Sequence, residues 1–169
     1  MTEESPMTRP AATDLKKILR FTLDEPRYAL ALAAVERVVP AVAILPLPQA
    51  PPFVLGVINV QGQILAAMDL RGRFGLAPRD LGLDDQFILA RTRRRRVALV
   101  ADSVEGVQEL AVGQWVPAGQ VPPGAEGLQG LAKVEDDLVL IYDLDQFLSL
   151  EEELRLDQAL DLESRGGRA

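Results

Sequence analysis

The sequence predicts an all-β fold of small strand-rich units, followed by one C-terminal helix. Short apolar runs recur along the chain with turn-forming residues between them, as in β-barrels and β-sandwiches. No helical pattern alternates with these runs, which argues against a parallel nucleotide-binding sheet. After Asp143 the period changes, because Phe147, Leu150, Leu154 and Leu160 have helical spacing and acidic residues between them. An amphipathic helix is therefore expected at the C-terminus.

The apolar runs form four strand pairs, each joined by a turn. In chain order the pairs are 18–23 with 28–32, 54–60 with 64–68, 87–90 with 97–100, and 128–134 with 138–141. Between the first two pairs we expect one helical turn at 33–36, a strand at Val38-Val39 and a Pro-rich loop at 46–52, since proline blocks strand pairing. A short helical segment is expected after Met68. Residues 72–85 mix Gly, Pro and Asp and are the natural joint between two halves.

Composition excludes several classes of function. The chain has 169 residues, of which 48% are hydrophobic and 25% charged, so a globular core is expected. It has no Cys and no His, which removes disulfides, thiolate or imidazole metal ligands and ordinary Ser-His-Asp or Cys-His catalysis. We therefore expect no enzyme activity, no catalytic residue, no cofactor and no metal.

Charge and hydropathy limit the partners and the location. The net charge of −7 opposes binding to nucleic acid or to an anionic membrane. No apolar run reaches the ~20 residues of a membrane span, and residues 1–14 are polar, typical of a flexible leader rather than of a signal peptide. A cytoplasmic protein with no direct membrane insertion is expected.

The most informative segment is Gly56–Leu76, GVINVQGQILAAMDLRGRFGL. Gln61-Gly62 is a two-residue hairpin turn, since glycine tolerates the positive φ that such turns require. The segment resembles the signature of the CheW-like adaptors of bacterial chemosensory arrays, roughly Gly-Val-Ile-Asn-Leu-Arg-Gly, an apolar strand, then Asp-Leu-Arg. Two later blocks, 96–105 and 128–145, resemble the same family in the same order. The resemblance covers most of residues 15–150.

This resemblance implies a fold and a function. The fold is two small five-stranded β-barrel subdomains around a shared apolar core, plus a C-terminal α-helix. We expect the CheW-like domain at 15–150 with a subdomain joint near 72–85, and a helix with a frayed tail at 151–169. The implied function is a non-catalytic adaptor that couples a chemoreceptor tip, or a divergent receptor, to a CheA-like histidine kinase. Two alternatives stay open: a structural paralogue that builds array rings without receptor contact, and an enzyme that uses carboxylates alone.

The resemblance places partner binding at Val35, Arg37, Asn59, Gln61 and Gly62. The chain departs from the family pattern at two of these positions. Many members have Arg where this chain has Gln61, and Glu where it has Arg37. The first change replaces a cation by a neutral amide, and the second inverts a charge. We therefore expect an altered partner, such as one from a surface-motility or other non-flagellar pathway.

Other charged residues favour structural roles. The Arg93–Arg96 run lacks the aromatic residues of a nucleic-acid site and is expected to be a solvated hairpin tip. Asp143 and Asp145 lack the spacing of a calcium loop, so Asp145 is expected to cap the last helix. Asp69 is expected to make a structural hydrogen bond near Arg71.

Overall fold

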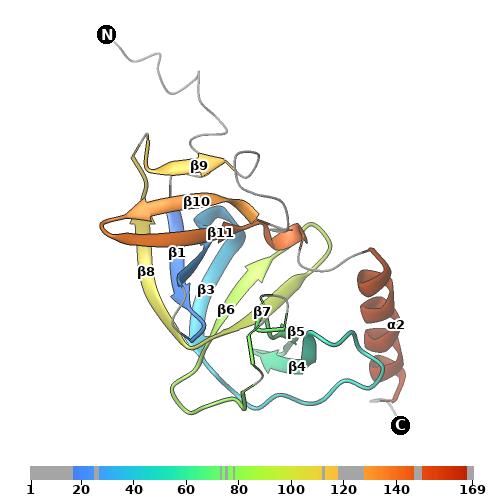
Figure 1. Cartoon of the computed structure of the whole chain (residues 1–169). Coiled ribbons are helices and arrows are strands. Elements are labelled where there is room, and N and C mark those ends of the chain that lie inside the picture. Colours follow the sequence, from blue (N-terminus) through green and yellow to red (C-terminus); the bar gives the residue numbers. More distant parts are fainter. Residues whose placement is uncertain are drawn as a thin grey trace.

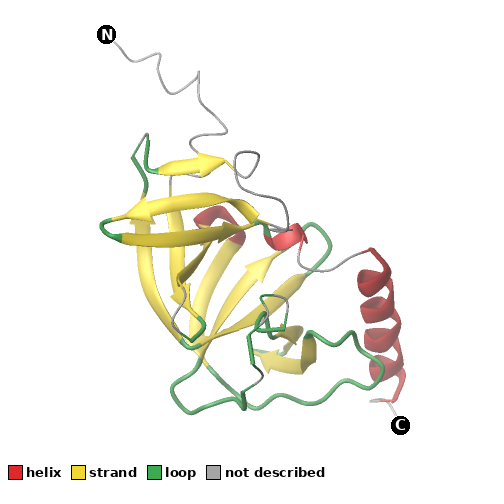
Figure 2. Ribbon diagram, viewed as in Figure 1, coloured by secondary structure: helices red, strands yellow, loops and turns green. Residues whose placement is uncertain are grey.

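The computed structural model describes residues 17–24, 27–72, 74, 76–77, 79–111, 113–117, 128–146 and 150–166. Their strands form two sheets, and a single α-helix follows at the C-terminus (Figure 2). Sheet A has the strand order β8 (Ser103–Glu109), β1 (Lys17–Thr22), β2 (Arg27–Ala31), β11 (Asp137–Tyr142), β10 (Leu128–Val134) and β9 (Trp115–Pro117). Sheet B has the order β3 (Val35–Pro40), β6 (Gln86–Arg91), β7 (Arg96–Ala101), β5 (Gln63–Met68) and β4 (Val54–Val60).

Two 3-10 turns and one helix complete the described fold. They are η2 (Leu32–Ala34), η4 (Leu144–Gln146) and α2 (Leu150–Gly166). The chain starts in sheet A, builds the whole of sheet B and then returns to sheet A (Figure 1). The fold class expected from the sequence is confirmed, with six strands in sheet A where five were expected.

Sheet B closes on itself through the chain that follows β3. Leu45 forms an antiparallel bridge with Val57 of β4, the opposite edge strand, through two N–H···O bonds of 2.8 Å. A glycine is required beside this bridge, because a Cβ on Gly56 would lie 2.1 Å from the Leu45 carbonyl oxygen. The chain that forms one edge strand, β3, therefore continues to a bridge with the other edge strand, β4, and gives sheet B the character of a small barrel.

The central strands β6 and β7 of sheet B are buried on both faces, which explains why their sequences are continuously apolar. Neighbouring residues of a strand point to opposite faces. Residues such as Ile58 and Leu89 belong to a cluster enclosed by sheet B, whereas Val57 and Ile88 belong to the large cluster shared by the two sheets. Sheet A encloses a third cluster around Ile18. The shared apolar core that the resemblance implied is confirmed.

A buried arginine fastens the two sheets. Arg71 is 2% exposed, and it donates to Asp24 of the β1–β2 turn at 2.6 Å and to Asp102 between β7 and β8. Its backbone N–H donates to the Asp69 carboxylate at 3.0 Å, which confirms the predicted hydrogen bond. Arg79 bonds the same Asp102 at 2.5 Å and Asp85 at 2.8 Å. The cluster joins sheet A to the connection between β5 and β6.

Helix α2 lies beside β4 and β5 (Figure 1), but it does not present the predicted face to the core. Leu154, expected to be buried, is 49% exposed, whereas Leu156 and Ala159 reach the shared core and Leu160 is half-buried. Phe147 lies outside the described residues. The cause is an ion pair: Arg95 of the β6–β7 turn holds Glu153 at 2.9 Å and Asp157 at 2.5 Å, and this fixes the rotation of the helix.

Two further local expectations are wrong. Asp145 does not cap α2, because it lies in η4 and accepts the Arg93 backbone N–H at 2.6 Å; Asp143 accepts the N–H of Asp145. The residues after Met68 form hydrogen-bonded turns, such as Phe74 N–H to Leu70 O, instead of the expected helical segment.

The domain boundaries stay predictions. The expected leader at 1–14 lies outside the described residues. The described part of the expected joint, 72–85, connects β5 to β6 within sheet B, and helix α2 extends to Gly166, inside the expected frayed tail.

Candidate partner-binding site

Asn59 and Gly62 shape the turn between β4 and β5. Gln61 and Gly62 both have positive φ, 51° and 86°, as two-residue hairpin turns of the favoured hand require. The Asn59 carboxamide oxygen accepts the Gly62 N–H at 2.8 Å. These two residues therefore fix the position of the Gln61 side chain, which is exposed.

Arg37 and Gln61, the two departures from the family pattern, contact each other. Arg37 Nη2 donates to Gln61 Oε1 at 3.2 Å, and this bond joins the edge strand β3 to the β4–β5 turn. Many family members have Glu and Arg at these positions, which puts the cation on the turn. Here the cation is on β3 and the neutral acceptor is on the turn. The two changes therefore move the positive charge from the turn to β3.

Val35 lies on the same strand but has a different environment. It is the first residue of β3, is half-buried and packs against the shared core. The turn η2, directly before it, lines a groove between the two sheets. The structure thus brings Arg37, Asn59, Gln61 and Gly62 together and puts Val35 beneath the edge of that groove.

This inter-sheet groove has a volume of about 270 Å³. Most of its lining comes from sheet A and the segments next to it, namely the end of β2, η2, β10, the end of β11 and η4, and Arg91 enters from sheet B. The lining residues are Leu30, Ala31, Ala33, Ala34, Arg91, Gln129, Tyr142, Asp143, Leu144 and Asp145. Sequence reasoning missed all of them as site residues, although the Asp143-x-Asp145 pair after the last strand was a visible signal.

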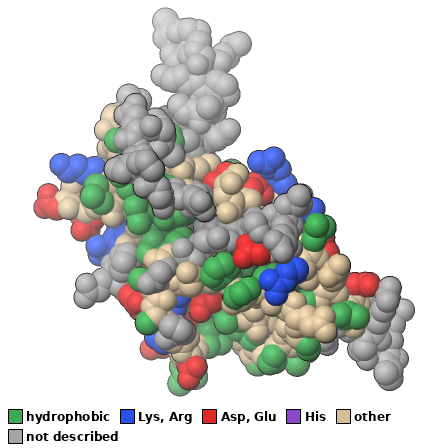
Figure 3. All heavy atoms as spheres, turned by 45° about the vertical axis from the view of Figure 1, so that its right-hand side comes forward, with side chains coloured by type: hydrophobic (Ala, Val, Ile, Leu, Met, Phe, Trp, Pro, Cys, Tyr) green, Lys and Arg blue, Asp and Glu red, His purple; other side chains and the backbone are tan. Residues whose placement is uncertain are grey.

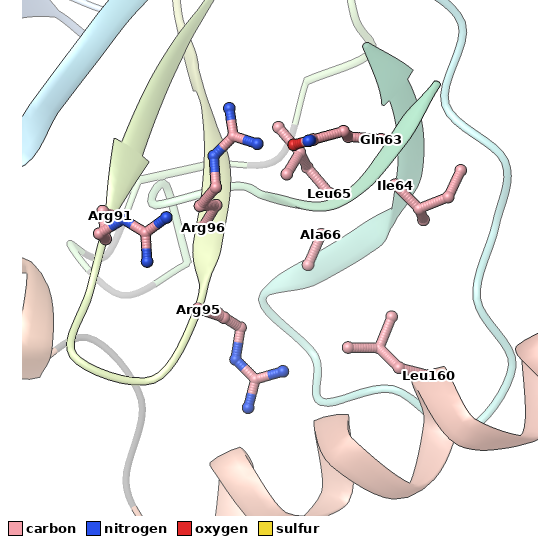
Figure 4. Close-up of a pocket in the computed structure, with 8 residues that line it drawn as sticks. All are labelled: Gln63, Ile64, Leu65, Ala66, Arg91, Arg95, Arg96 and Leu160. Atoms are coloured by element: carbon pink, nitrogen blue, oxygen red, sulfur yellow. The ribbon is translucent and has the colours of Figure 1, made fainter. Parts of the chain in front are cut away.

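A second groove, of about 460 Å³, lies between β5, the β6–β7 turn and α2 (Figure 4). Its lining combines apolar side chains from β5 and α2 with three arginines. The residues are Gln63, Ile64, Leu65, Ala66, Arg91, Arg95, Arg96 and Leu160. Among the described residues, Arg91, at the end of β6, is the one that lines both grooves.

The arginine run is not simply a solvated tip. Thr92 Oγ1 accepts the N–H groups of Arg94 and Arg95 and shapes the turn. Arg93 then bonds Asp145, Arg95 holds α2, and Arg96 bonds Glu36 of β3 at 2.8 Å. This part of the prediction is wrong because the acidic partners lie far away in sequence.

The groove chemistry favours recognition. The Asp145 carboxylate is bound by the Arg93 backbone N–H, and the Asp143 carboxylate accepts the backbone N–H of Asp145. Within the described residues no group of three or more acidic side chains could hold a metal ion. A membrane-crossing helix was sought over the same residues, and none is long and apolar enough. Acidic and basic side chains alternate with hydrophobic ones on the face shown in Figure 3.

The fold and its grooves thus define a β-rich binding domain, and comparison with known proteins identifies its family. The family model described as "CheW-like domain" matches residues 17–152. The chain belongs to this family.

Named relatives agree with this assignment. The chemotaxis protein CheW of Thermotoga maritima is 28% identical over 136 residues, covering 78% of this chain and 87% of the relative. That of Klebsiella aerogenes is 28% identical over 146 residues, covering 84% and 87%. The crystal structure of the scaffolding protein TtCheW from Thermoanaerobacter tengcongensis matches with a TM-score of 0.73 and 30% identity, over 81% of this chain and 94% of that one.

Proposed function

We propose that this protein is a non-catalytic cytoplasmic adaptor that couples a chemosensory receptor to a CheA-like histidine kinase. Family membership and the scaffolding role named for a relative of 30% identity support this proposal. The observation that carries it is the presence of two grooves that share Arg91 in their linings, since an adaptor needs neighbouring sites for its partners.

The mechanism is geometric. An apolar helix of the receptor tip lies in the inter-sheet groove, whose edge Val35 supports. Arg37 and Gln61 contact a partner directly, while Asn59 and Gly62 hold the turn that presents Gln61. Binding both partners at once raises their effective concentration and transmits the receptor state as a coupling free energy.

The Arg37–Gln61 contact offers a test with built-in controls. Gln61→Arg alone places two cations together and breaks the contact, and Arg37→Glu alone leaves an acceptor facing the amide. The double variant Gln61→Arg, Arg37→Glu restores the family pair, so it should bind a standard chemoreceptor tip several-fold more tightly than either single variant or the original chain. A pull-down that shows no gain for the double variant would refute the site assignment.

A second candidate is a structural paralogue that binds the kinase or other CheW-like domains to build array rings without receptor contact. The positive charge on β3 instead of the turn in the Arg37–Gln61 pair is the observation that favours it. Co-purification from the native cytosol separates the two functions. An adaptor retains receptor and kinase, whereas a ring paralogue retains the kinase or itself and lacks receptor.

A further inference from the structure

A β-bulge aims the Glu36 side chain at two arginines. Strand β3 pairs with β6 through Val35↔Ala90 and Arg37↔Leu89, and the register shift between these pairs leaves Glu36 as the extra residue. Bulges of this kind bend a strand and redirect a side chain. Glu36 consequently reaches the last pair of the β6–β7 hairpin, Arg91↔Arg96.

The Glu36 carboxylate offsets the repulsion between Arg91 and Arg96, but it binds Arg96 more closely than it binds Arg91. Like charges directly opposite each other destabilise a hairpin. Arg96 makes close contacts with Glu36, from Nε and Nη2 at 2.8 Å each. Arg91 has only Nε at 3.6 Å, which is beyond hydrogen-bond distance, and its side chain is 62% exposed. Within the described part of the chain, the side chain of Arg91 makes no hydrogen bond.

This loosely paired cation lines both grooves. In Figure 4 Arg91 and Arg96 extend from neighbouring strands at the groove edge, while Arg95 extends toward α2. Asp143 and Asp145 line the same inter-sheet groove, and Asp145 is bound by Arg93, two residues after Arg91. The lining of this groove therefore combines the exposed cation of Arg91 with the carboxylates of Asp143 and Asp145.

We propose that Arg91 is a specificity-determining residue of the inter-sheet groove, and that it selects a partner helix carrying a carboxylate that faces the end of β6. A guanidinium binds a carboxylate through two parallel N–H···O bonds, whereas the Asp143 carboxylate in the same lining disfavours a partner's carboxylate beside it, so Arg91 decides where that carboxylate lies. Glu36 is an internal competitor for Arg91 and remains bound to Arg96 when Arg91 turns to the partner. This inference rests on the proposed adaptor function.

The test uses the full chain and a soluble cytoplasmic-tip fragment of a chemoreceptor from the same organism, with affinity measured by calorimetry. Arg91→Ala should weaken binding about tenfold, the usual effect of losing a charged hydrogen-bonding partner, and Arg91→Glu should weaken it further. Arg94→Glu is the matched control, because Arg94 is exposed on the same turn and lines neither groove. It should change affinity less than twofold.

Two further measurements separate recognition from a structural role. Glu36→Gln should strengthen binding a few-fold at low salt and lose that gain at high salt, since it removes the competitor; a merely structural residue gives no gain. In addition, one Asp→Lys or Glu→Lys change in the receptor fragment should restore binding to the Arg91→Glu variant.

Equal weakening by Arg91→Glu and Arg94→Glu would overturn the inference, because the effect would then be general electrostatics. Unchanged binding of the Arg91→Glu variant, with an unchanged unfolding midpoint, would also overturn it. If the original chain binds no receptor fragment while it binds the kinase, the adaptor function fails first and this inference fails with it.

Discussion

Arg71 and Arg91 have the same side chain, but the first is buried in an ion-pair cluster and the second is exposed. Arg71 is 2% exposed and is held by two carboxylates from different parts of the chain, Asp24 and Asp102. Arg91 is 62% exposed and has one carboxylate at 3.6 Å. A buried, closed cluster fixes the fold because each charge depends on its partners. An exposed, loosely paired charge contributes little to stability and is available to a partner.

Replacing each arginine in turn should show the largest difference between the two environments. Arg71→Ala leaves two carboxylates without their buried partner, so we expect it to lower the free energy of unfolding by about 3–5 kcal/mol. Arg91→Ala should lower it by less than about 0.5 kcal/mol. Urea unfolding of both variants measures the difference, and similar losses would show that the contrast in burial does not decide the two roles.

Two glycines of sheet B show the same contrast, since Gly56 is tightly packed against Leu45 and Gly62 has open space around it. Gly56→Ala forces a methyl group against the Leu45 carbonyl at the bridge that closes the sheet, and it should cost about 3 kcal/mol. Gly62→Ala, where nothing lies within 4 Å of the added atom, should cost only the ~1 kcal/mol of a left-handed alanine. Equal losses in thermal or urea unfolding would argue against the closure of sheet B through Leu45.

The exposure of the Arg95 side chain, 14%, lies between those of Arg71 and Arg91. Arg95→Ala leaves buried Glu153 unpaired, so we expect a loss of about 2 kcal/mol, between the values for exposed and buried pairs. The loss should be local: hydrogen exchange should accelerate in α2 and stay unchanged in β6 and β7. Arg94→Ala is the control, and comparable acceleration in that variant would contradict the anchoring role of Arg95.

The smallest expected effect is a dependence on pH. Burial disfavours ionised Asp102, but hydrogen bonds from Arg71, the Asp24 N–H and Arg79 outweigh it, so its pKa is lowered from the ordinary 3.8. A lowered folded-state pKa gives stability that is fully present above the unfolded value and is lost as pH falls through the folded value. Stability should therefore fall below about pH 4, less steeply in Asp102→Asn. Identical slopes in acid titrations of the two proteins would contradict this.

Local sequence signals predicted the four hairpins and the strand at Val38-Val39, because each hairpin combines an apolar run with its own turn chemistry; β8 and β9 were not predicted. The Gln61-Gly62 turn and the Asp69–Arg71 hydrogen bond both lie within a few residues and were predicted correctly. The buried face of α2 was not, since its rotation depends on an ion pair between Arg95 and Glu153, 58 positions apart. A hydrophobic pattern alone ranks Leu154 above Glu153 for burial.

The grooves could not be read from the sequence for the same reason. The inter-sheet groove combines the end of β2, η2, the end of β6 and the residues after β11, and no local pattern relates these segments. Resemblance supplied the site near Val35, Arg37 and Gln61. Only the structure shows that Arg37 and Gln61 touch, and that a bulge at Glu36 points its carboxylate at Arg91 and Arg96.

The central claim is that one chain holds two partners at the same time. Sedimentation velocity of the protein with a receptor-tip fragment and the regulatory domain of a CheA-like kinase tests it directly. The account predicts a single faster species that contains all three components. Displacement of the kinase domain by the receptor fragment, with only binary complexes at saturating concentrations, would contradict it.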